Sequence, residues 1–178
     1  MTATQLGASY HDGCPVTPSA LRLLTVSYVG FDGTTHAGRL VVAADWADPL
    51  AGVFATLYAE RFPIRTMRPV TEFGASDDAS MAADNTSAFN CRAVTGGSSF
   101  SEHSYGTAID LNPLENPYVS GGLVEPDAGA DYLDRNNVRP GMIAADGPVV
   151  AAFAGIGWSW GGTWSSPTDY QHFSASGR

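Results

Sequence analysis

The pattern of apolar and polar positions over residues 21–30 and 38–43 predicts two β-strands near the start of the chain. The residues between them, FDGTTH, favour turns, so we expect the two strands to be joined there. Residues 1–20 are also rich in turn-forming residues. This first segment is therefore expected to wrap over the surface of the domain.

The clearest helical pattern follows these strands. Asp48 suits an N-cap and Pro49 suits the first helical turn, and the helix is expected to end near Phe62 and Pro63. Apolar residues recur at helical spacing along one face of this segment, namely Leu50, Val53, Phe54, Leu57 and Tyr58.

The middle of the chain is harder to divide. Residues 64–70 and 106–112 have strand character, and residues 88–94 are expected to be extended. The polar stretch at residues 71–86, which lies between the strand at 64–70 and the extended segment at 88–94, predicts a loop.

Residues 113–145 contain four prolines and several Gly, Asn and Asp residues, so they predict a long excursion of the kind that forms lids or rims of sites. Residues 147–157 predict a short helix that begins at Pro148 and stops at Gly157. Hairpins and helices without regular alternation indicate an α+β fold, with a small antiparallel sheet flanked by helices. We expect residues 1–178 to form a single domain.

The chain has 178 residues, of which 44% are hydrophobic and 15% charged, and its formal net charge is −9. Such a length suffices for one buried core. The acidic balance argues against nucleic acid and anionic membranes as partners, because both favour clustered Lys and Arg. No apolar run approaches the roughly 20 residues that span a bilayer. The first ten residues lack the basic and apolar regions of a signal peptide, so the protein is made without one or has been trimmed.

Two cysteines, Cys14 and Cys91, lie far apart and form no CxxC metal pair. One interpretation is that both are small buried residues. The other is a disulfide that anchors the N-terminal loop to the middle of the chain, as an oxidising compartment permits.

The segment SEHSYGTAIDL places His103, Gly106 and Asp110 close together. An odd separation puts two side chains on opposite faces of a straight strand, so His103 and Asp110 converge only if the chain bends between them. Gly106 provides that bend, because glycine tolerates backbone angles that other residues avoid. The segment therefore predicts two ligands of a metal site, or else a polar loop before a strand.

A third ligand must come from another part of the chain. His11 and His36 lie in turn-like stretches and are expected to be exposed loop residues. His172 follows Asp169 by three positions, and a turn between them would aim His172 at a metal and Asp169 at the metal's water. Two imidazoles, one ligating carboxylate and a spare carboxylate suit a catalytic zinc site with an open position.

These motifs resemble those of a known family. SEHSYGTAID fits the SxHxxGxAxD signature of the VanY-type zinc peptidases, which include D-alanyl-D-alanine carboxypeptidases and L-alanyl-D-glutamate endopeptidases such as phage endolysins. WGGTWSSPTDYQHF resembles the closing motif of the endopeptidase and VanY-like branch. The likeness is most specific over residues 86–173 and loose over residues 1–60.

The resemblance implies a hedgehog/DD-peptidase-like fold and one Zn²⁺ ion. His103, Asp110 and His172 would be its ligands and Asp169 the catalytic base. Arg92 lies where the family keeps an arginine that stabilises transition-state charge, although spacing there varies. A surface residue at a strand end is the alternative interpretation of Arg92.

Aromatic residues surround these motifs. Trp158, Trp160 and Trp164 flank two glycines, which fits core packing and also fits the wall of a peptide groove. We expect Trp160, Trp164 and Tyr105 to line that groove. Ser101 is expected to hydrogen-bond the backbone near His103 and so to order that ligand.

The resulting hypothesis is a monomeric peptidase that cuts the stem peptide of peptidoglycan, outside the cytoplasm or as a lysin released at lysis. The Asp at position 169 favours L-alanyl-D-glutamate endopeptidase activity by resemblance. A D-alanyl-D-alanine carboxypeptidase is the alternative, and it would need a cation for the terminal carboxylate, with Arg135 or Arg139 as donors. A zinc-bearing cell-wall binding module without catalysis is a third possibility.

Overall fold

The computed structural model describes residues 1–94 and 97–178, which form an α+β fold. The sequence therefore predicts the fold class correctly. The helices are α1 (Ala3–Leu6), α2 (Ala47–Ala59), α3 (Asp77–Ala82) and α4 (Pro148–Ala154). The strands are β1 (Leu21–Val29), β2 (Thr35–Ala43), β3 (Thr66–Met67), β4 (Asn85–Thr86), β5 (Ala108–Asp110), β6 (Tyr118–Ser120), β7 (Leu123–Glu125), β8 (Ser159–Trp160), β9 (Thr168–Asp169) and β10 (His172–Ser174).

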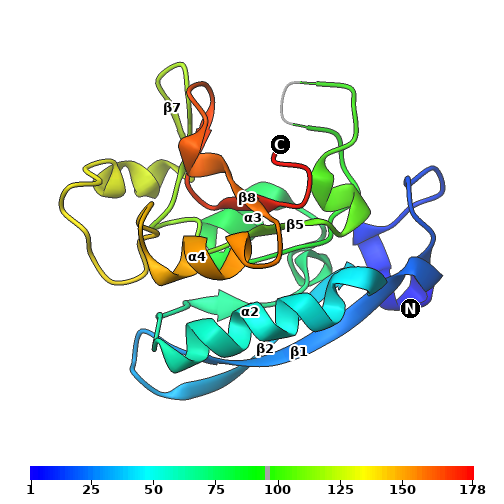
Figure 1. Ribbon diagram of the computed structural model, residues 1–178. Helices are drawn as coiled ribbons and strands as arrows, with labels where there is room; N and C mark the ends of the chain where they lie inside the picture. The colour runs from blue at the N-terminus through cyan, green and yellow to red at the C-terminus, as the bar shows by residue number, and fades with distance from the viewer. Residues whose placement is uncertain (95–96) are drawn as a thin grey trace.

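The first two strands pair as a long antiparallel hairpin, and α2 packs against it (Figure 1). Both strands were predicted, but β2 begins at Thr35, within the stretch that was expected to form the turn. The helix begins at Ala47, because the 3-10 helix η3 (Ala44–Trp46) runs directly into it, so Asp48 lies in the first turn and is not the cap. It ends at Ala59, earlier than expected. Its apolar face is buried through Leu50, Val53, Phe54 and Leu57.

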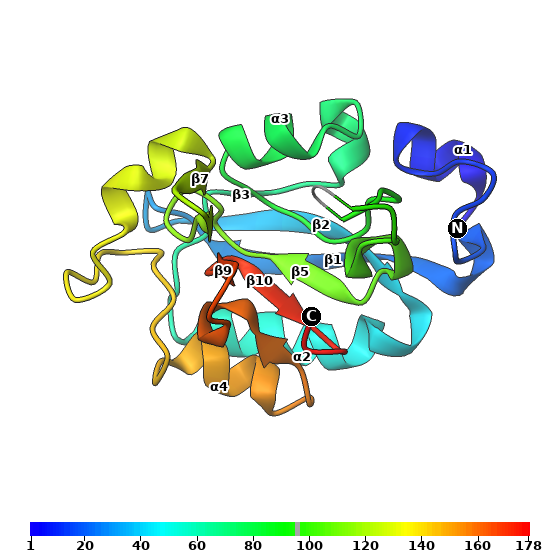
Figure 2. The ribbon, with the colours of Figure 1, turned by 90° about the horizontal axis from the view of Figure 1, so that it is seen from above.

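A second layer lies above the hairpin and α2 in Figure 1. It consists of α4 and a three-stranded antiparallel sheet in the order β5-β10-β8 (Figure 2). Phe153 of α4 stacks on Phe173 of β10 with ring centroids 4.0 Å apart, and both side chains are fully buried. Ile109 of β5 joins the same core. One face of this sheet is therefore closed by apolar packing, which leaves the other face for polar side chains.

The stretch expected to be a loop contains regular structure. Ser76 caps α3 by accepting a hydrogen bond from the backbone of Ala79, and β4 pairs with β3 in parallel. The strand expected over 64–70 is limited to the two residues of β3. Helix α3 has only six residues, too short a span for an apolar period to reveal it in the sequence.

The excursion at 113–145 is ordered as well. It forms the hairpin of β6 and β7, and β6 also pairs with β9. Arg135 fastens the excursion to the body, since its guanidinium donates to the backbone oxygens of Glu115 at 2.8 Å and Ile143 at 2.7 Å and to Oδ1 of Asn116 at 3.0 Å. The expected helix over 147–157 is α4, with Pro148 in its first turn, and it ends before Gly155.

The N-terminal segment packs over a second apolar cluster and is tied to it covalently. Leu6 is buried there with Leu21, Val41 and Phe89, and Cys14 is disulfide-bonded to Cys91. The structure thus selects the disulfide from the two interpretations of the cysteines. Among the described residues, no helix is both long enough and apolar enough to span a bilayer.

The disulfide closes a long loop, because its cysteines are 77 positions apart. Cross-linking such a loop restricts the unfolded chain and typically contributes about 2–4 kcal/mol to stability. We expect the double variant Cys14→Ser with Cys91→Ser to lose about that much free energy of unfolding. Urea denaturation of both proteins measures the loss, and equal midpoints would contradict it.

Candidate metal centre

The pairing of β5 with β10 brings two of the expected metal ligands together. In this antiparallel pair His172 lies directly opposite Asp110, and Phe173 lies opposite Ile109. Side chains opposite each other across antiparallel strands project from the same face. Because Ile109 and Phe173 fill the core, His172 and Asp110 must share the opposite face.

The third side chain, His103, lies on the short 3-10 helix η5 (Glu102–Tyr105) just before β5. The helix ends at Gly106, whose φ of 70° lies in the left-handed region that favours glycine. This is the bend that the sequence predicts between His103 and Asp110. Ser101 caps η5, since its Oγ accepts a hydrogen bond from the backbone N–H of His103 at 3.3 Å, and the role expected of Ser101 agrees with this contact.

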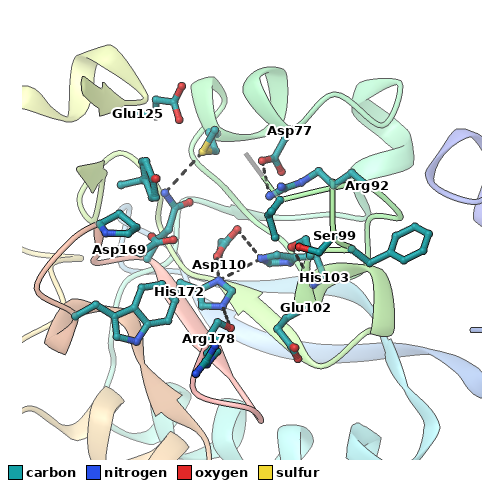
Figure 3. Close-up of a pocket in the computed structure, with 18 residues that line it drawn as sticks. Asp77, Arg92, Ser99, Glu102, His103, Asp110, Glu125, Asp169, His172 and Arg178 are labelled. Carbon is teal, nitrogen blue, oxygen red and sulfur yellow. Dashed lines mark hydrogen bonds and ion pairs between the residues drawn. The ribbon is translucent and has the colours of Figure 1, made fainter. Parts of the chain in front are cut away.

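The three side chains converge on a common point (Figure 3). Nε2 of His103 lies 3.0 Å from Oδ2 of Asp110 and 3.3 Å from Nδ1 of His172. Nδ1 of His172 lies 3.0 Å from Oδ1 of Asp110. All three residues are buried. We call His103, Asp110 and His172 the ligand cluster.

Each imidazole uses its other nitrogen to bind a backbone carbonyl. Nδ1–H of His103 donates to the oxygen of Ala88 at 2.6 Å, and Nε2–H of His172 donates to the oxygen of Arg178 at 3.1 Å. A carbonyl oxygen only accepts, so these nitrogens carry the hydrogens. Such contacts fix the ring orientation of metal-binding histidines. They leave Nε2 of His103 and Nδ1 of His172 to face Asp110.

The ligand cluster fits a tetrahedral cation. Donors about 2.0–2.1 Å from a tetrahedral centre lie about 3.3 Å from one another, close to the separations in the cluster. Two nitrogens and one carboxylate oxygen are a donor set that suits Zn²⁺. A further group of potential ligands, His11 with Cys14 and Cys91, does not qualify in this form, because both sulfurs are bonded to each other and metals bind thiolates.

The buried charges of the ligand cluster stabilise one another. Burial alone would raise the pKa of Asp110, but the two imidazoles beside it outweigh burial and hold that pKa well below its ordinary value. Burial acts to lower the pKa of His172, yet the hydrogen bond and charge of Asp110 raise it to about 9. Without a cation, His172 is therefore an imidazolium at neutral pH.

Asp169 is a separate, partly buried residue at the edge of the ligand cluster, and the Oδ1 atom of its carboxyl is fully buried. Burial raises its pKa to about 7, and the charge of Asp110 acts in the same direction while His172 opposes it. Its Oδ1 has no hydrogen-bond partner among the described residues. A carboxyl that exchanges its proton near neutral pH suits a general base or acid.

Arg92 lies on the other side of Asp110 from Asp169 in Figure 3. Its guanidinium forms an ion pair with Asp77, with Nη2 and Oδ2 2.7 Å apart. The sequence did not single out Asp77, because it lies in the stretch expected to be a loop and no local spacing links it to Arg92.

The ligand cluster, Asp169 and Arg92 all line one cavity of about 460 Å³. Trp164 lines it too, as expected. Trp160 does not, because its ring is buried in the core and its Nε1–H donates to the oxygen of Tyr170. Tyr105 is exposed on η5 and lies outside the lining, so the placement expected for these two side chains was wrong.

The two arginines proposed to bind a terminal carboxylate do not reach this cavity. Arg135 holds the excursion in place, and Arg139 stacks on Tyr132 with its guanidinium carbon 3.6 Å from the ring centre. Arg178 lines the cavity instead, together with the acidic residue Glu125 and the amide Gln171. The carbonyl oxygen of Arg178 also accepts hydrogen bonds from His172 and from Ser174.

A family model described as D-alanyl-D-alanine carboxypeptidase matches residues 95–175. This match supports the resemblance of residues 95–175 to the VanY-type zinc peptidases. This VanY-type segment contains His103, Asp110, Asp169 and His172, whereas Arg92 precedes it. Searches of curated proteins and of solved structures found no match, so the hedgehog/DD-peptidase-like fold stays a prediction.

Gly106 is the residue on which the position of His103 depends. A Cβ at this position would lie 2.6 Å from the backbone nitrogen of Ala43 and 2.9 Å from Cδ2 of Leu21. We expect Gly106→Ala to lose about 1–2 kcal/mol through backbone strain and about 1–3 kcal/mol through overpacking. The displaced His103 should also weaken Zn²⁺ binding on the order of 10- to 100-fold.

Gly33→Ala is the matched control. Gly33 also has a positive φ, of 76°, but an added Cβ there meets nothing within 4 Å. This variant should lose only the strain energy and keep full Zn²⁺ affinity. Thermal unfolding and isothermal titration measure both quantities, and equal effects of the two substitutions would contradict the role of Gly106.

The raised pKa of His172 predicts proton release on metal binding. A cation binds the neutral imidazole, whereas the metal-free residue with a pKa of about 9 is mostly protonated at pH 8. Zn²⁺ binding at pH 8 should therefore release about one proton, and the apparent affinity should rise with pH until about 9. Calorimetric titrations in buffers of different ionisation enthalpy count the protons. A count near zero would show that His172 loses no proton when Zn²⁺ binds.

Proposed function

We propose that the protein is a zinc-dependent peptidase that hydrolyses an amide bond in the stem peptide of bacterial peptidoglycan. The observation that carries the proposal is the ligand cluster, in which three buried donors converge beside a cavity that also contains a spare carboxyl. The VanY-type segment supports the same conclusion, since it contains all three donors and Asp169.

In this proposal His103, Asp110 and His172 hold the Zn²⁺ ion. A zinc ion in such a site acts as a Lewis acid and lowers the pKa of bound water to about 7. Asp169 accepts a proton from water in the cavity and returns it to the departing amine. Its burial supports this role, because a carboxyl with a pKa of about 7 can both take up and release a proton at neutral pH.

Arg92 supplies positive charge to the same cavity. Attack on an amide carbonyl places negative charge on the oxygen, and a fixed cation nearby stabilises that charge. The position of Arg92 in the cavity wall supports this role over that of a solvated surface residue. Trp164 gives the wall an apolar surface against which a peptide can pack.

Two activities, which cut different bonds of the stem peptide, fit this site. The aspartate at position 169 favours an L-alanyl-D-glutamate endopeptidase, by resemblance to that branch of the family. The description of the matching family model and the presence of Arg178 in the cavity wall favour a D-alanyl-D-alanine carboxypeptidase, since a terminal carboxylate needs a cation. We propose the endopeptidase first and the carboxypeptidase second.

A binding module without catalysis fits the site less well. A purely structural zinc site is closed by four protein ligands, whereas the close-packed group among the described residues has three. A structural site also has no use for the buried carboxyl of Asp169, which raises the cost of folding.

The proposed place of action is outside the cytoplasm, at the cell wall, either as a secreted enzyme or as a lysin released at lysis. The Cys14–Cys91 disulfide supports an oxidising compartment. We propose that the protein acts as a monomer, because the ligand cluster is assembled from one chain.

Digestion of purified peptidoglycan with and without a chelator tests the proposal. We expect cleavage that stops on chelation and returns with Zn²⁺. Mass spectrometry of the products then assigns the bond. New N-terminal D-Glu indicates the endopeptidase, and free D-Ala indicates the carboxypeptidase.

Asp169→Asn should lower kcat by about a hundredfold or more and leave Zn²⁺ bound, because general base catalysis typically contributes about 10²–10⁴-fold. Asp146→Asn, at an exposed aspartate, is the matched control and should retain full activity. Loss of Zn²⁺ from Asp169→Asn would show that Asp169 is a ligand and that the division of roles is wrong.

A further inference from the structure

Asp77 and Arg92 form an ion pair in the wall of the cavity. Asp77 is the first residue of α3, and the two side chains are 21% and 25% exposed. An ion pair shielded to this degree holds its geometry better than one in open solvent, where screening and side-chain freedom weaken it.

The main chain of Arg92 is fastened to the turn that carries His103. Its N–H donates to Oγ of Ser104 at 2.9 Å, and the same Oγ donates to its carbonyl oxygen at 2.7 Å. The N–H of Ser101 donates to that carbonyl at 3.0 Å. These contacts fix where the side chain of Arg92 begins, but they leave the direction of its long side chain open.

Contacts of the guanidinium settle that direction. Nη2 pairs with Asp77, and Nη1 donates to the oxygen of Ala93 at 3.2 Å. Nε is buried and has no hydrogen-bond partner among the described residues. Asp77 is therefore the one charged anchor that the described residues give to Arg92.

We propose that Asp77 is a positioning residue that holds the guanidinium of Arg92 beside the ligand cluster. The inference rests on the proposed function, since it assumes that Arg92 acts on substrate charge. Helix α3 thus brings a carboxylate to the cavity wall from outside the VanY-type segment.

The electrostatics agree with this arrangement. Burial raises the pKa of Asp77 and the charge of Arg92 limits the rise, while Asp110 and His103 are near enough to act on it as well. A carboxylate at this point also offsets part of the charge of Arg92, and this reduces the cost of holding a partly buried cation.

The competing explanation is that Asp77 only anchors α3 to the body of the protein. Asp77→Asn distinguishes the two, because asparagine keeps an oxygen acceptor of the same size but loses the charge that orients Arg92. The adjacent Asp78 offers a matched control, since it lies on the same helix turn and is exposed.

We expect Asp77→Asn to lower kcat on peptidoglycan fragments on the order of 10- to 100-fold with KM little changed, as misplacement of a catalytic group does. Asp78→Asn should be unchanged. In a background with Arg92→Lys, Asp77→Asn should have no further effect, because Asp77 acts through Arg92. An effect that multiplies with Arg92→Lys would overturn the proposal in favour of a purely structural role.

A second readout does not depend on activity. The side-chain ¹⁵Nε–¹H NMR signal of Arg92, assigned by its loss in Arg92→Lys, should be sharp and slowly exchanging in the Zn²⁺-loaded protein and in Asp78→Asn. In Asp77→Asn it should broaden or exchange rapidly. An unchanged signal would overturn the proposal even if the protein proved inactive on peptidoglycan, whereas the expected change without hydrolysis would count against the proposed function alone.

Discussion

The pairing of β10 with β5 is the constraint on which the site depends. It sets His172 opposite Asp110 on one face and Phe173 opposite Ile109 on the other. A shift of one residue would turn the imidazole into the core and a phenyl ring into the cavity. The stacking of Phe153 on Phe173 therefore does more than fill space, because the apolar face of the sheet selects the register that brings two metal-binding side chains together.

The burial that fixes the register also makes it costly to keep charged groups in the ligand cluster. Carboxylates and imidazoles lose hydration in this position, which costs several kcal/mol for an unpaired charge. Asp110 compensates by pairing with both imidazoles, and their outer nitrogens are satisfied by the carbonyls of Ala88 and Arg178. Burial outweighs the charge of His172 at Asp169, whose Oδ1 has no hydrogen-bond partner among the described residues, so its pKa is raised while that of Asp110 is lowered.

The parts of this structure that the sequence predicts are those encoded by neighbouring residues. Alternation around Asp110 and the glycine at 106 predict a bend followed by a strand, and the structure contains both. The face of Trp160 could not be predicted, because it depends on how β8 pairs with β10. Asp77 was missed for a related reason, since its link to Arg92 is a tertiary contact that leaves no periodic signal in the sequence.

The site therefore has two origins along the chain. The VanY-type segment supplies the ligand cluster and Asp169, whereas the preceding residues supply the cation, Arg92, and its partner on α3. Cys91 lies next to Arg92 and is disulfide-bonded to Cys14. The N-terminal segment therefore restrains the backbone beside Arg92. Loops that carry functional groups need a rigid base. The disulfide and the hydrogen bonds between Ser104 and the backbone of Arg92 provide that base here. The N-terminal segment therefore supports the site and also forms part of the surface.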